Sequence, residues 1–289
     1  MSGSIPILHV KGKSLPEAWE NSLVALYENG ARIKTQYDRS ANPPSIDATM
    51  GIEIEAPLSE PRIHRCFPGG LDILEEYRQE VLDGIKDSWI RDKNDPTDTR
   101  WEYTYHERLF SYSYNESNGT EKRFDQINDI IEKLSQTPYS RRAQAITWKV
   151  WEDLAVHDPA CLQSVWCRIL ADDEGVWTLN MNIRFRSNDA YEAAFMNMFA
   201  FTLLQQRIAD EISKRAGREV KLGRYYHMAD SYHIYGNKIE EFEQRFLGQM
   251  KSRSFEDRTW YTEFAQPIFD EAKENIKIKL KEQEEKYKK

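Results

Sequence analysis

The chain has 289 residues, 40% of them hydrophobic and 12% aromatic, so it can bury a sizeable core, and we expect one domain over residues 1–289. A formal charge of -8 and a pI near 5.4 argue against a nucleic-acid partner, because polyanion binding normally leaves a basic surplus on the domain. No apolar run is long enough to span a bilayer and the N-terminus lacks a signal-peptide pattern, so we expect a soluble cytoplasmic protein with no membrane partner.

The N-terminal half of the chain carries signals for three helices and a strand. Ser14 and Glu17 have the spacing of a capping box, and the apolar positions that follow end at Gly30, which predicts a helix over residues 15–29. Ile52 and Ile54 alternate with acidic residues, as in a half-buried strand. Further along, similar patterns predict helices over 71–85 and 125–135 and polar loops over 92–99 and 115–120.

The C-terminal half predicts strands around one long buried helix. Residues 143–151 are rich in β-branched and aromatic side chains and are expected to form a strand. In residues 177–186 apolar side chains alternate with asparagines and arginines, which is the period-two pattern of a strand with one buried face. The apolar stretch 190–215 predicts a buried helix, and another strand is expected near 231–235. The charged residues from about 270 to 289 predict a frayed helix or a disordered tail.

Neither a disulfide framework nor a metal site is indicated. The three cysteines are odd in number and lack CxxC spacing, so we expect reduced thiols. The six histidines have no metal-ligand spacing beyond the loose pair His227 and His233, and we assign no metal. Because the sequence contains no Gly-rich phosphate loop, any bound phosphate must be held by side chains.

Three features have the chemistry of a phosphate-binding, nucleophilic site. Cys161 follows a proline-containing turn, and a thiol becomes a useful nucleophile when nearby cations stabilise its thiolate. The segments Ser140-Arg141-Arg142 and Arg186-Ser187 combine guanidinium forks with a hydroxyl, which suits a phosphate monoester. Taken alone, the cysteine could equally be a small buried apolar residue and the arginines surface ion-pairing groups.

The third feature is Asn197, whose neighbours in 193–201 are apolar. A buried amide must find partners, either on the backbone or on a bound ligand. Its donor and acceptor match the edge of a pyrimidine, so both interpretations stay open.

Taken in order, these residues resemble the signature of the thymidylate synthase superfamily. The match covers about residues 100–240 and rests on the ordered segments Tyr139-Ser140-Arg141-Arg142, Ala145-Ile146-Thr147-Trp148, Pro159-Ala160-Cys161, Arg186-Ser187-Asn188-Asp189, Asn197 and Asp230-Ser231-Tyr232-His233-Ile234-Tyr235. Tyr103-Thr104-Tyr105 and Cys161-Leu162-Gln163 look closer to archaeal-type synthases and to 5-hydroxymethylases of CMP, dCMP or dUMP. The resemblance implies an α/β (α+β) fold, with a large mixed twisted sheet used in dimerisation and flanking helices.

The resemblance also implies a role for each site residue. Cys161 would add to C6 of a pyrimidine nucleoside monophosphate and make C5 nucleophilic, which is covalent catalysis. The arginines near the thiol would lower its pKa. The resemblance implies a homodimer with shared sites, in which Arg186 and Ser187 of one subunit bind the phosphate together with Arg141 and Arg142 of the partner subunit. It further implies that Asn197 recognises the base and that His233 and Tyr235 bind the sugar. Tyr105, Asp189 and an early glutamate are implied to assist catalysis. For that glutamate we choose Glu80 over Glu75 and Glu76.

The implied one-carbon donor is 5,10-methylenetetrahydrofolate or a related methylene-pterin. Residue Leu162 replaces the histidine of the bacterial enzymes, and residues 281–289 are charged where those enzymes have an apolar closing tail. A site open to water adds water to the transferred carbon, so this favours 5-hydroxymethylation of dUMP or (d)CMP. The alternatives are reductive methylation of dUMP to dTMP and a catalytically silent nucleotide-binding relative.

For the base, uracil and cytosine both remain possible, and for the sugar, deoxyribose and ribose. Asn197 favours uracil, but a flipped amide would serve cytosine. Lys149 and the small Ala193 and Ala194 are interpreted as space for a ribose 2′-hydroxyl.

Overall fold

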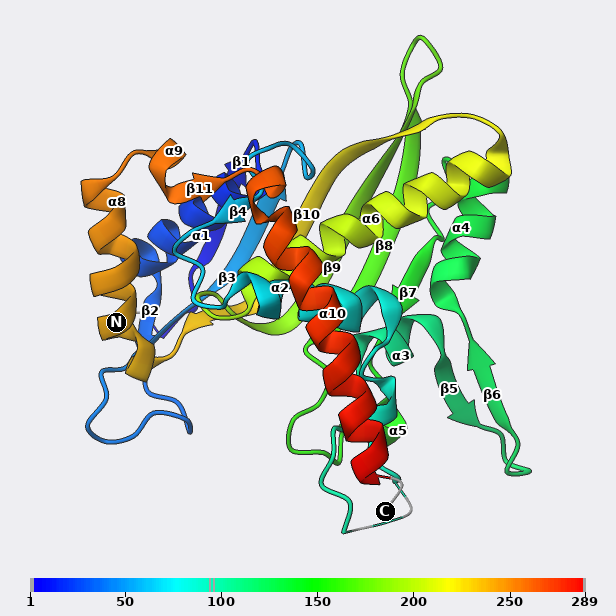
Figure 1. Cartoon of the computed structure of the whole chain (residues 1–289), viewed down its shortest axis with the longest axis horizontal. Coiled ribbons are helices and arrows are strands. Elements are labelled where there is room, and N and C mark those ends of the chain that lie inside the picture. Colours follow the sequence, from blue (N-terminus) through cyan, green and yellow to red (C-terminus); the bar gives the residue numbers. More distant parts are fainter. Residues whose placement is uncertain (1–2, 94, 96, 288–289) are drawn as a thin grey trace.

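A seven-stranded mixed sheet forms the centre of the computed structural model, which describes residues 3–93, 95 and 97–287, the last five of these by backbone alone. The strand order is β1-β3-β10-β9-β8-β7, and the short β2 pairs with β3 (Figure 1). β1 pairs with β3, and β9 with β10, in parallel, while the other neighbours are antiparallel. The strands are β1 (Ile7–Gly12), β2 (Ala31–Ile33), β3 (Ser45–Ile54), β7 (Gln144–Ile146), β8 (Leu162–Ala171), β9 (Trp177–Asp189) and β10 (Val220–Ile234).

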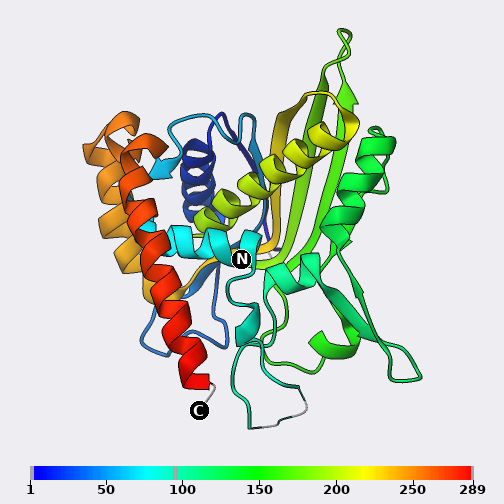
Figure 2. The ribbon, with the colours of Figure 1, turned by 45° about the vertical axis from the view of Figure 1, so that its right-hand side comes forward.

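Helices cover one face of this sheet. α6 runs across the strands, and α2 and then α10 lie outside it (Figures 1 and 2). The helices are α1 (Leu15–Asn29), α2 (Leu71–Asp83), α3 (Tyr105–Phe110), α4 (Gln126–Gln136), α5 (Val150–Asp153), α6 (Ala194–Ala216), α7 (Ile239–Glu241), α8 (Gly248–Ser252), α9 (Phe255–Arg258) and α10 (Thr262–Tyr287). Two small antiparallel pairs complete the fold: β4 (Ile63–His64) with β11 (Thr259–Trp260), and β5 (Tyr112–Asn115) with β6 (Glu121–Phe124). The predicted mixed sheet with flanking helices is confirmed.

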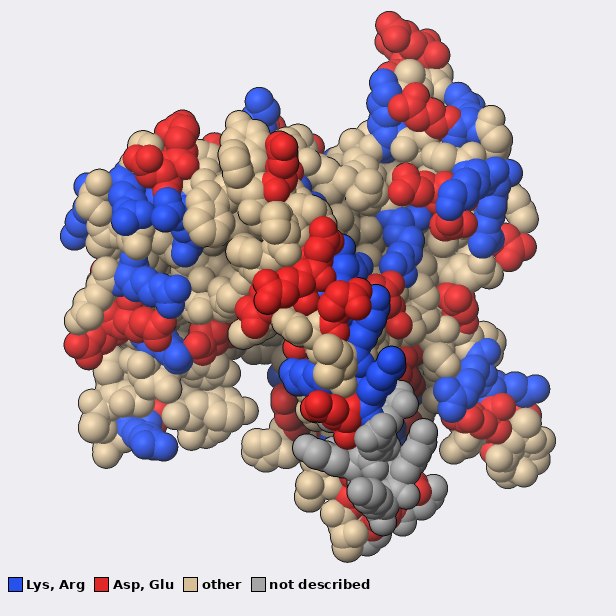
Figure 3. Space-filling model, in the orientation of Figure 1, with Lys and Arg blue, Asp and Glu red and all other residues tan. Residues whose placement is uncertain are grey.

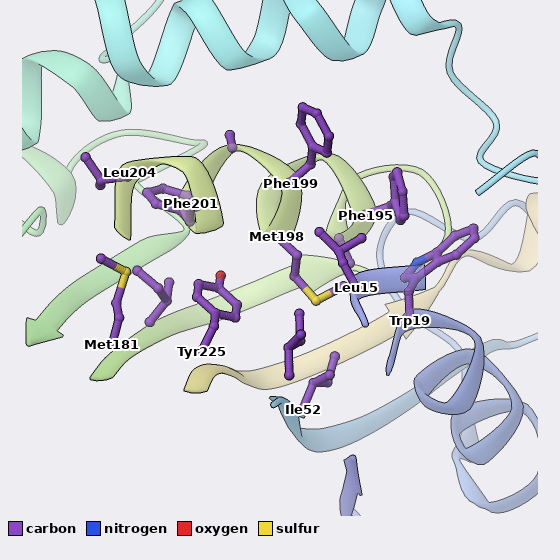
Figure 4. Close-up of a cluster of buried hydrophobic side chains, with 14 of the residues drawn as sticks. Leu15, Trp19, Ile52, Met181, Phe195, Met198, Phe199, Phe201, Leu204 and Tyr225 are labelled. Carbon is purple, nitrogen blue, oxygen red and sulfur yellow. The ribbon is translucent and has the colours of Figure 1, made fainter. Parts of the chain in front are cut away.

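The core lies between α6 and the sheet. On β9 the alternate residues from Leu179 to Phe185 are buried, whereas Arg184 is exposed, as the period-two pattern predicts. Met198 of α6 lies above Ile52 and Tyr225 of the sheet (Figure 4). Phe199 points to the other side of α6, where its ring lies 6.1 Å from that of Phe269 on α10. The first half of α6, residues 194–204, is therefore buried on both sides, which explains why its sequence is apolar almost all round.

The prediction of a strand over residues 143–151 is only partly correct. β7 ends at Ile146, and α5 begins four residues later. The buried guanidinium of Arg108 explains the break, because it donates to the carbonyl of Thr147 at 2.9 Å and to Asp153 of α5 at 2.9 Å. These bonds draw the chain away from the sheet.

Of the two alternatives predicted for residues 270–289, the helix is confirmed as far as Tyr287, but it packs against the rest of the fold instead of fraying. α10 begins at Thr262, and its residues Phe269 and Ile276 are buried. Lys279 of α10 also forms an ion pair of 3.1 Å with Glu76 of α2. Figure 3 shows acidic and basic side chains next to each other on this side of the molecule. Residues 288–289 lie outside the described residues.

The described ranges contain no helix with the length and apolar content that a bilayer span requires.

Candidate active site

A cleft of about 510 Å³ collects most of the predicted site residues. Its walls come from α2, the segment before α3, the turn before β8, the ends of β9 and β10, and the first turn of α6. The predicted residues that line it are Cys161, Glu80, Tyr105, Ser187, Asp189, Asn197, His233 and Tyr235. Its volume lies in the range of about 300–1,000 Å³ that is usual for small-molecule sites.

A larger hollow, of about 1130 Å³, lies between residues 90–93 and the β5–β6 hairpin. Its cations are paired with carboxylates, as in Lys93 with Glu152 and Arg91 with Glu102 (2.9 Å). It contains none of the predicted site residues. We therefore place the candidate active site in the smaller cleft.

Cys161 lies in the turn immediately before β8, and Arg186 of β9 stabilises this turn through hydrogen bonds. The backbone N–H of Arg186 donates to the carbonyl of Cys161 at 2.8 Å. Its guanidinium donates to the carbonyls of Ala160 (Nε, 3.1 Å) and Pro159 (Nη2, 2.5 Å). The N–H of Cys161 contacts the hydroxyl of Tyr103 at 3.4 Å. The thiol is thus held at the cleft wall by bonds to its own turn.

The expectation that arginines lower the pKa of the Cys161 thiol is confirmed for Arg186 only, and the net change within the single chain is upward. Burial raises this pKa, Arg186 offsets part of the effect, and Asp158 raises it further. Arg141 and Arg142 do not act on the thiol, because they are exposed beside α4 and do not line the cleft.

The other two cysteines lie in the core. Cys66 and Cys167 are buried, and burial raises the pKa of Cys167 to about 12. Cys161 is therefore the most accessible of the three thiols.

Three tyrosines surround the thiol, and only one of them was predicted. Tyr105 and Tyr103 have ring centroids 5.7 Å apart, and Tyr77 reaches the same cleft from α2. Burial raises the pKa of all three phenols, so they remain protonated at neutral pH. They supply O–H groups to the cleft.

Asn197 faces the cleft because α6 begins at Ala194 and carries it in its first turn. Its Oδ1 accepts a hydrogen bond from the Tyr77 hydroxyl. The side chain does not bond a neighbouring backbone group within the described residues, which removes that alternative.

His233 and Tyr235 form the opposite end of the cleft, with ring centroids 4.6 Å apart. Ser231 donates to Asp47 at 2.8 Å, and its oxygen lies 3.3 Å from Nδ1 of His233. Because the serine proton is used on the aspartate, the serine oxygen accepts the Nδ1 proton. Nε2 of His233 has no protein partner in the described part of the chain, but it is fully buried and is not exposed to the cleft.

A buried carboxyl, Glu80, and a half-buried one, Asp189, contribute to the remaining wall. Asp189 accepts the N–H groups of Tyr191 (2.9 Å) and Glu192 (2.8 Å), which shapes the turn before α6, and burial raises its pKa. Burial likewise raises the pKa of Glu80, although Lys86 lies 3.1 Å away and lowers it. Both carboxyls can therefore exchange protons more readily than exposed ones.

Some predicted residues do not face this cleft. The side chain of Arg186 lies on the other face of the sheet, in a shallow hollow beside Arg184 and Gln163. Lys149 is buried and bonds Glu107 at 2.9 Å, so its interpretation as part of a sugar site is wrong. Ala193 lines the cleft, whereas Ala194 is buried in α6.

The family model described as thymidylate synthase matches residues 72–284. The chain belongs to the thymidylate synthase family. As a member of this family it is a one-carbon transferase. A protein of Methanocaldococcus jannaschii with the provisional name thymidylate synthase is 29% identical over 246 residues, which cover 83% of this chain and 96% of that protein.

More distant members of the thymidylate synthase family agree with this assignment. The thymidylate synthase of Streptococcus gordonii is 27% identical over 125 residues, 43% of this chain and 42% of its own. The solved thermostable thymidylate synthase A of Bacillus subtilis has the same fold, with a TM-score of 0.57 and 17% identity over 80% of this chain and 83% of that one.

Sequence reasoning missed several groups at the site of this thymidylate synthase family member. Tyr77 lies one helical turn before Glu80 on α2, and that spacing was the only signal for it. Asp47 lies on β3, and its register partner His233 on β10 was not evident without the sheet.

Proposed function

We propose that this member of the thymidylate synthase family transfers a one-carbon unit to C5 of a pyrimidine nucleoside 5′-monophosphate through a covalent adduct of Cys161. The observation that carries the proposal is the grouping of a partly accessible thiol, the Asn197 amide and the paired side chains of His233 and Tyr235 in one cleft. These groups match the C6 carbon, the base edge and the sugar hydroxyl of such a substrate.

The chain's own residues account for the bond changes on the pyrimidine. Sγ of Cys161, as thiolate, forms a bond to C6, and the C5–C6 electron pair moves to C5, which becomes nucleophilic. After C5 has bonded to the new carbon, its proton must leave, and Tyr105 and Glu80 are the proposed proton-handling groups. The electron pair that this proton leaves at C5 would break the bond between the new carbon and the donor nitrogen, and water would add to the resulting exocyclic methylene. The electron pair returned to C5 then reforms the C5–C6 double bond, the C6–S bond breaks with its pair on sulfur, and the 5-hydroxymethyl product is released.

A flat one-carbon donor fits the outer part of this cleft. Trp101 is 39% exposed there, and its ring is held by Lys86 at 5.1 Å and by Trp89, whose ring centroid lies 5.4 Å away. A fixed, exposed indole face suits a pterin ring. When bound, methylenetetrahydrofolate or a related methylene-pterin supplies the electrophilic carbon.

A homodimer with shared sites supplies the phosphate ligands in this proposal. Arg186 and Ser187 come from one chain, and the partner's Arg141 and the partner's Arg142 from the other. The uncovered face of the sheet supports this arrangement, because Arg186 points to that face and the helices cover the opposite one.

Hydroxymethylation is the reaction that we propose first. α10 packs on α6 through Phe269 and on α2 through the Lys279–Glu76 pair, while the described residues that line the cleft end at Tyr235. Such a cleft leaves water free to add to the transferred carbon. Reductive methylation of dUMP is the alternative, and the names of the relatives favour it.

One experiment separates these reactions. The purified protein is incubated with methylenetetrahydrofolate and dUMP, dCMP or CMP carrying tritium at C5, and the product mass is measured. Hydroxymethylation releases tritium without forming dihydrofolate. Dihydrofolate that appears in step with product indicates methylation, and no release with any nucleotide would reject both in favour of a silent nucleotide-binding relative.

A further inference from the structure

The amide of Asn197 is oriented by a residue outside the family motifs described above. Asn197 is 5% exposed and lines the cleft, and the hydroxyl of Tyr77 on α2 donates to its Oδ1. Within the described part of the chain Nδ2 has no hydrogen-bond partner, and it is not among the unpartnered atoms that are fully buried there. Its N–H groups therefore face the cleft.

The Tyr77 hydroxyl distinguishes the two orientations of this amide. An asparagine amide can exchange its oxygen and nitrogen with little change of shape. In the observed orientation the phenolic proton has an acceptor. In the flipped orientation Nδ2 would donate to the phenol, and the phenolic proton would lose its acceptor in a buried setting, which is unfavourable.

The surroundings of Tyr77 keep its proton in place. The groups that act on its phenol are Glu80, Tyr103, Tyr225 and Cys161, and each of them raises its pKa, as burial does. The hydroxyl is therefore a donor at any working pH, and none of these neighbours takes its hydrogen bond within the described residues. The amide orientation is fixed by a permanent donor.

We propose that Tyr77 is a specificity-determining residue, which makes the cleft select a pyrimidine with a carbonyl oxygen at C4. Nδ2 of Asn197 donates to O4 of uracil, and the second lone pair of Oδ1 accepts the N3 proton. Cytosine carries an amino group at C4 and no proton on N3, so both contacts become unfavourable. This inference rests on the proposed function and narrows its substrate to uracil nucleotides.

The test measures binding, so that base preference is read without turnover. dUMP and dCMP are titrated by calorimetry into the Cys161→Ser protein and into the same protein with Tyr77→Phe or Tyr112→Phe added. Tyr77→Phe removes the hydroxyl and keeps the ring. Tyr112→Phe is the matched control, because Tyr112 is a buried tyrosine whose hydroxyl bonds the carbonyl of Trp148 at 2.9 Å and which does not line the cleft.

We expect the Cys161→Ser protein to prefer dUMP over dCMP by about tenfold or more, which is the effect of one buried hydrogen bond. Tyr77→Phe should reduce this preference by about tenfold, with little change for Tyr112→Phe. Thermal melting shows that each variant is folded.

Three results would overturn the proposal for Tyr77. They are a parent that binds both nucleotides equally, a preference unchanged by Tyr77→Phe, and an equal loss with Tyr112→Phe. In all three the proposed function stands, because a pyrimidine nucleotide still binds. A folded parent that binds neither nucleotide overturns the proposed function and this inference with it.

Discussion

Co-expression of Cys161→Ser and Arg142→Ala chains tests whether two subunits build each site. Within one chain Arg142 is exposed beside α4 and lies outside the cleft that contains Cys161. Either substitution alone therefore removes one part of every site in a homodimer. A mixed dimer has one site that lacks both residues and one site in which Cys161 and the partner's Arg142 are both intact.

The size of the recovery follows from this geometry. Random pairing of equal amounts makes about half of the dimers mixed, and one of their two sites is intact, so about one quarter of the wild-type activity should return. The assay is tritium release from C5 of the nucleotide, on mixed dimers isolated through two different affinity tags. In the isolated mixed dimers the expected activity is about half of wild type.

A second pair of variants provides the control. Cys161→Ser and Arg186→Ala change two residues that we assign to the same subunit, so every site in their mixed dimer lacks one of them. This pair should show no recovery. Isolated mixed dimers of the first pair that are as inactive as those of the second would refute shared sites.

Three further predictions use the same cleft and its supports. Cys161→Ser should abolish turnover and keep nucleotide affinity within about tenfold, measured by calorimetry; unchanged turnover would remove the mechanism. Iodoacetamide should alkylate Cys161 faster as pH rises, with a midpoint above that of an exposed cysteine thiol, because the thiolate reacts and burial raises the thiol pKa. Asp158→Asn should move the midpoint down, and an upward move would contradict the assignment of charges. Arg108→Met leaves Asp153 buried without its arginine partner and should lower the free energy of unfolding by about 3–5 kcal/mol in urea titrations. Arg123→Met removes an exposed ion pair with Glu121 and should change this free energy by less than about 1 kcal/mol. Equal effects of the two substitutions would refute a contribution of the buried pair.

Much of the fold followed from local patterns. α1 spans the predicted range, and α2, α4, α6 and β9 lie within a few residues of theirs, because periodic burial of one face is recorded along the sequence itself. The exceptions have long-range causes. Residues 147–153 leave the sheet because Arg108 binds them, and the charged α10 is ordered because it packs on α2. The single domain remains a prediction.

By itself, the sequence determined the kinds of chemical group at the site. The thiol, the arginine forks, the amide and the sugar-binding pair were evident from their order along the chain, and so was the superfamily. Only the tertiary structure decided what each group contacts. Tyr77 and Asn197 are 120 positions apart and meet only because α2 packs on α6. The raised pKa of Cys161 likewise comes from burial, which arises when distant segments exclude water from the thiol and which no local pattern records.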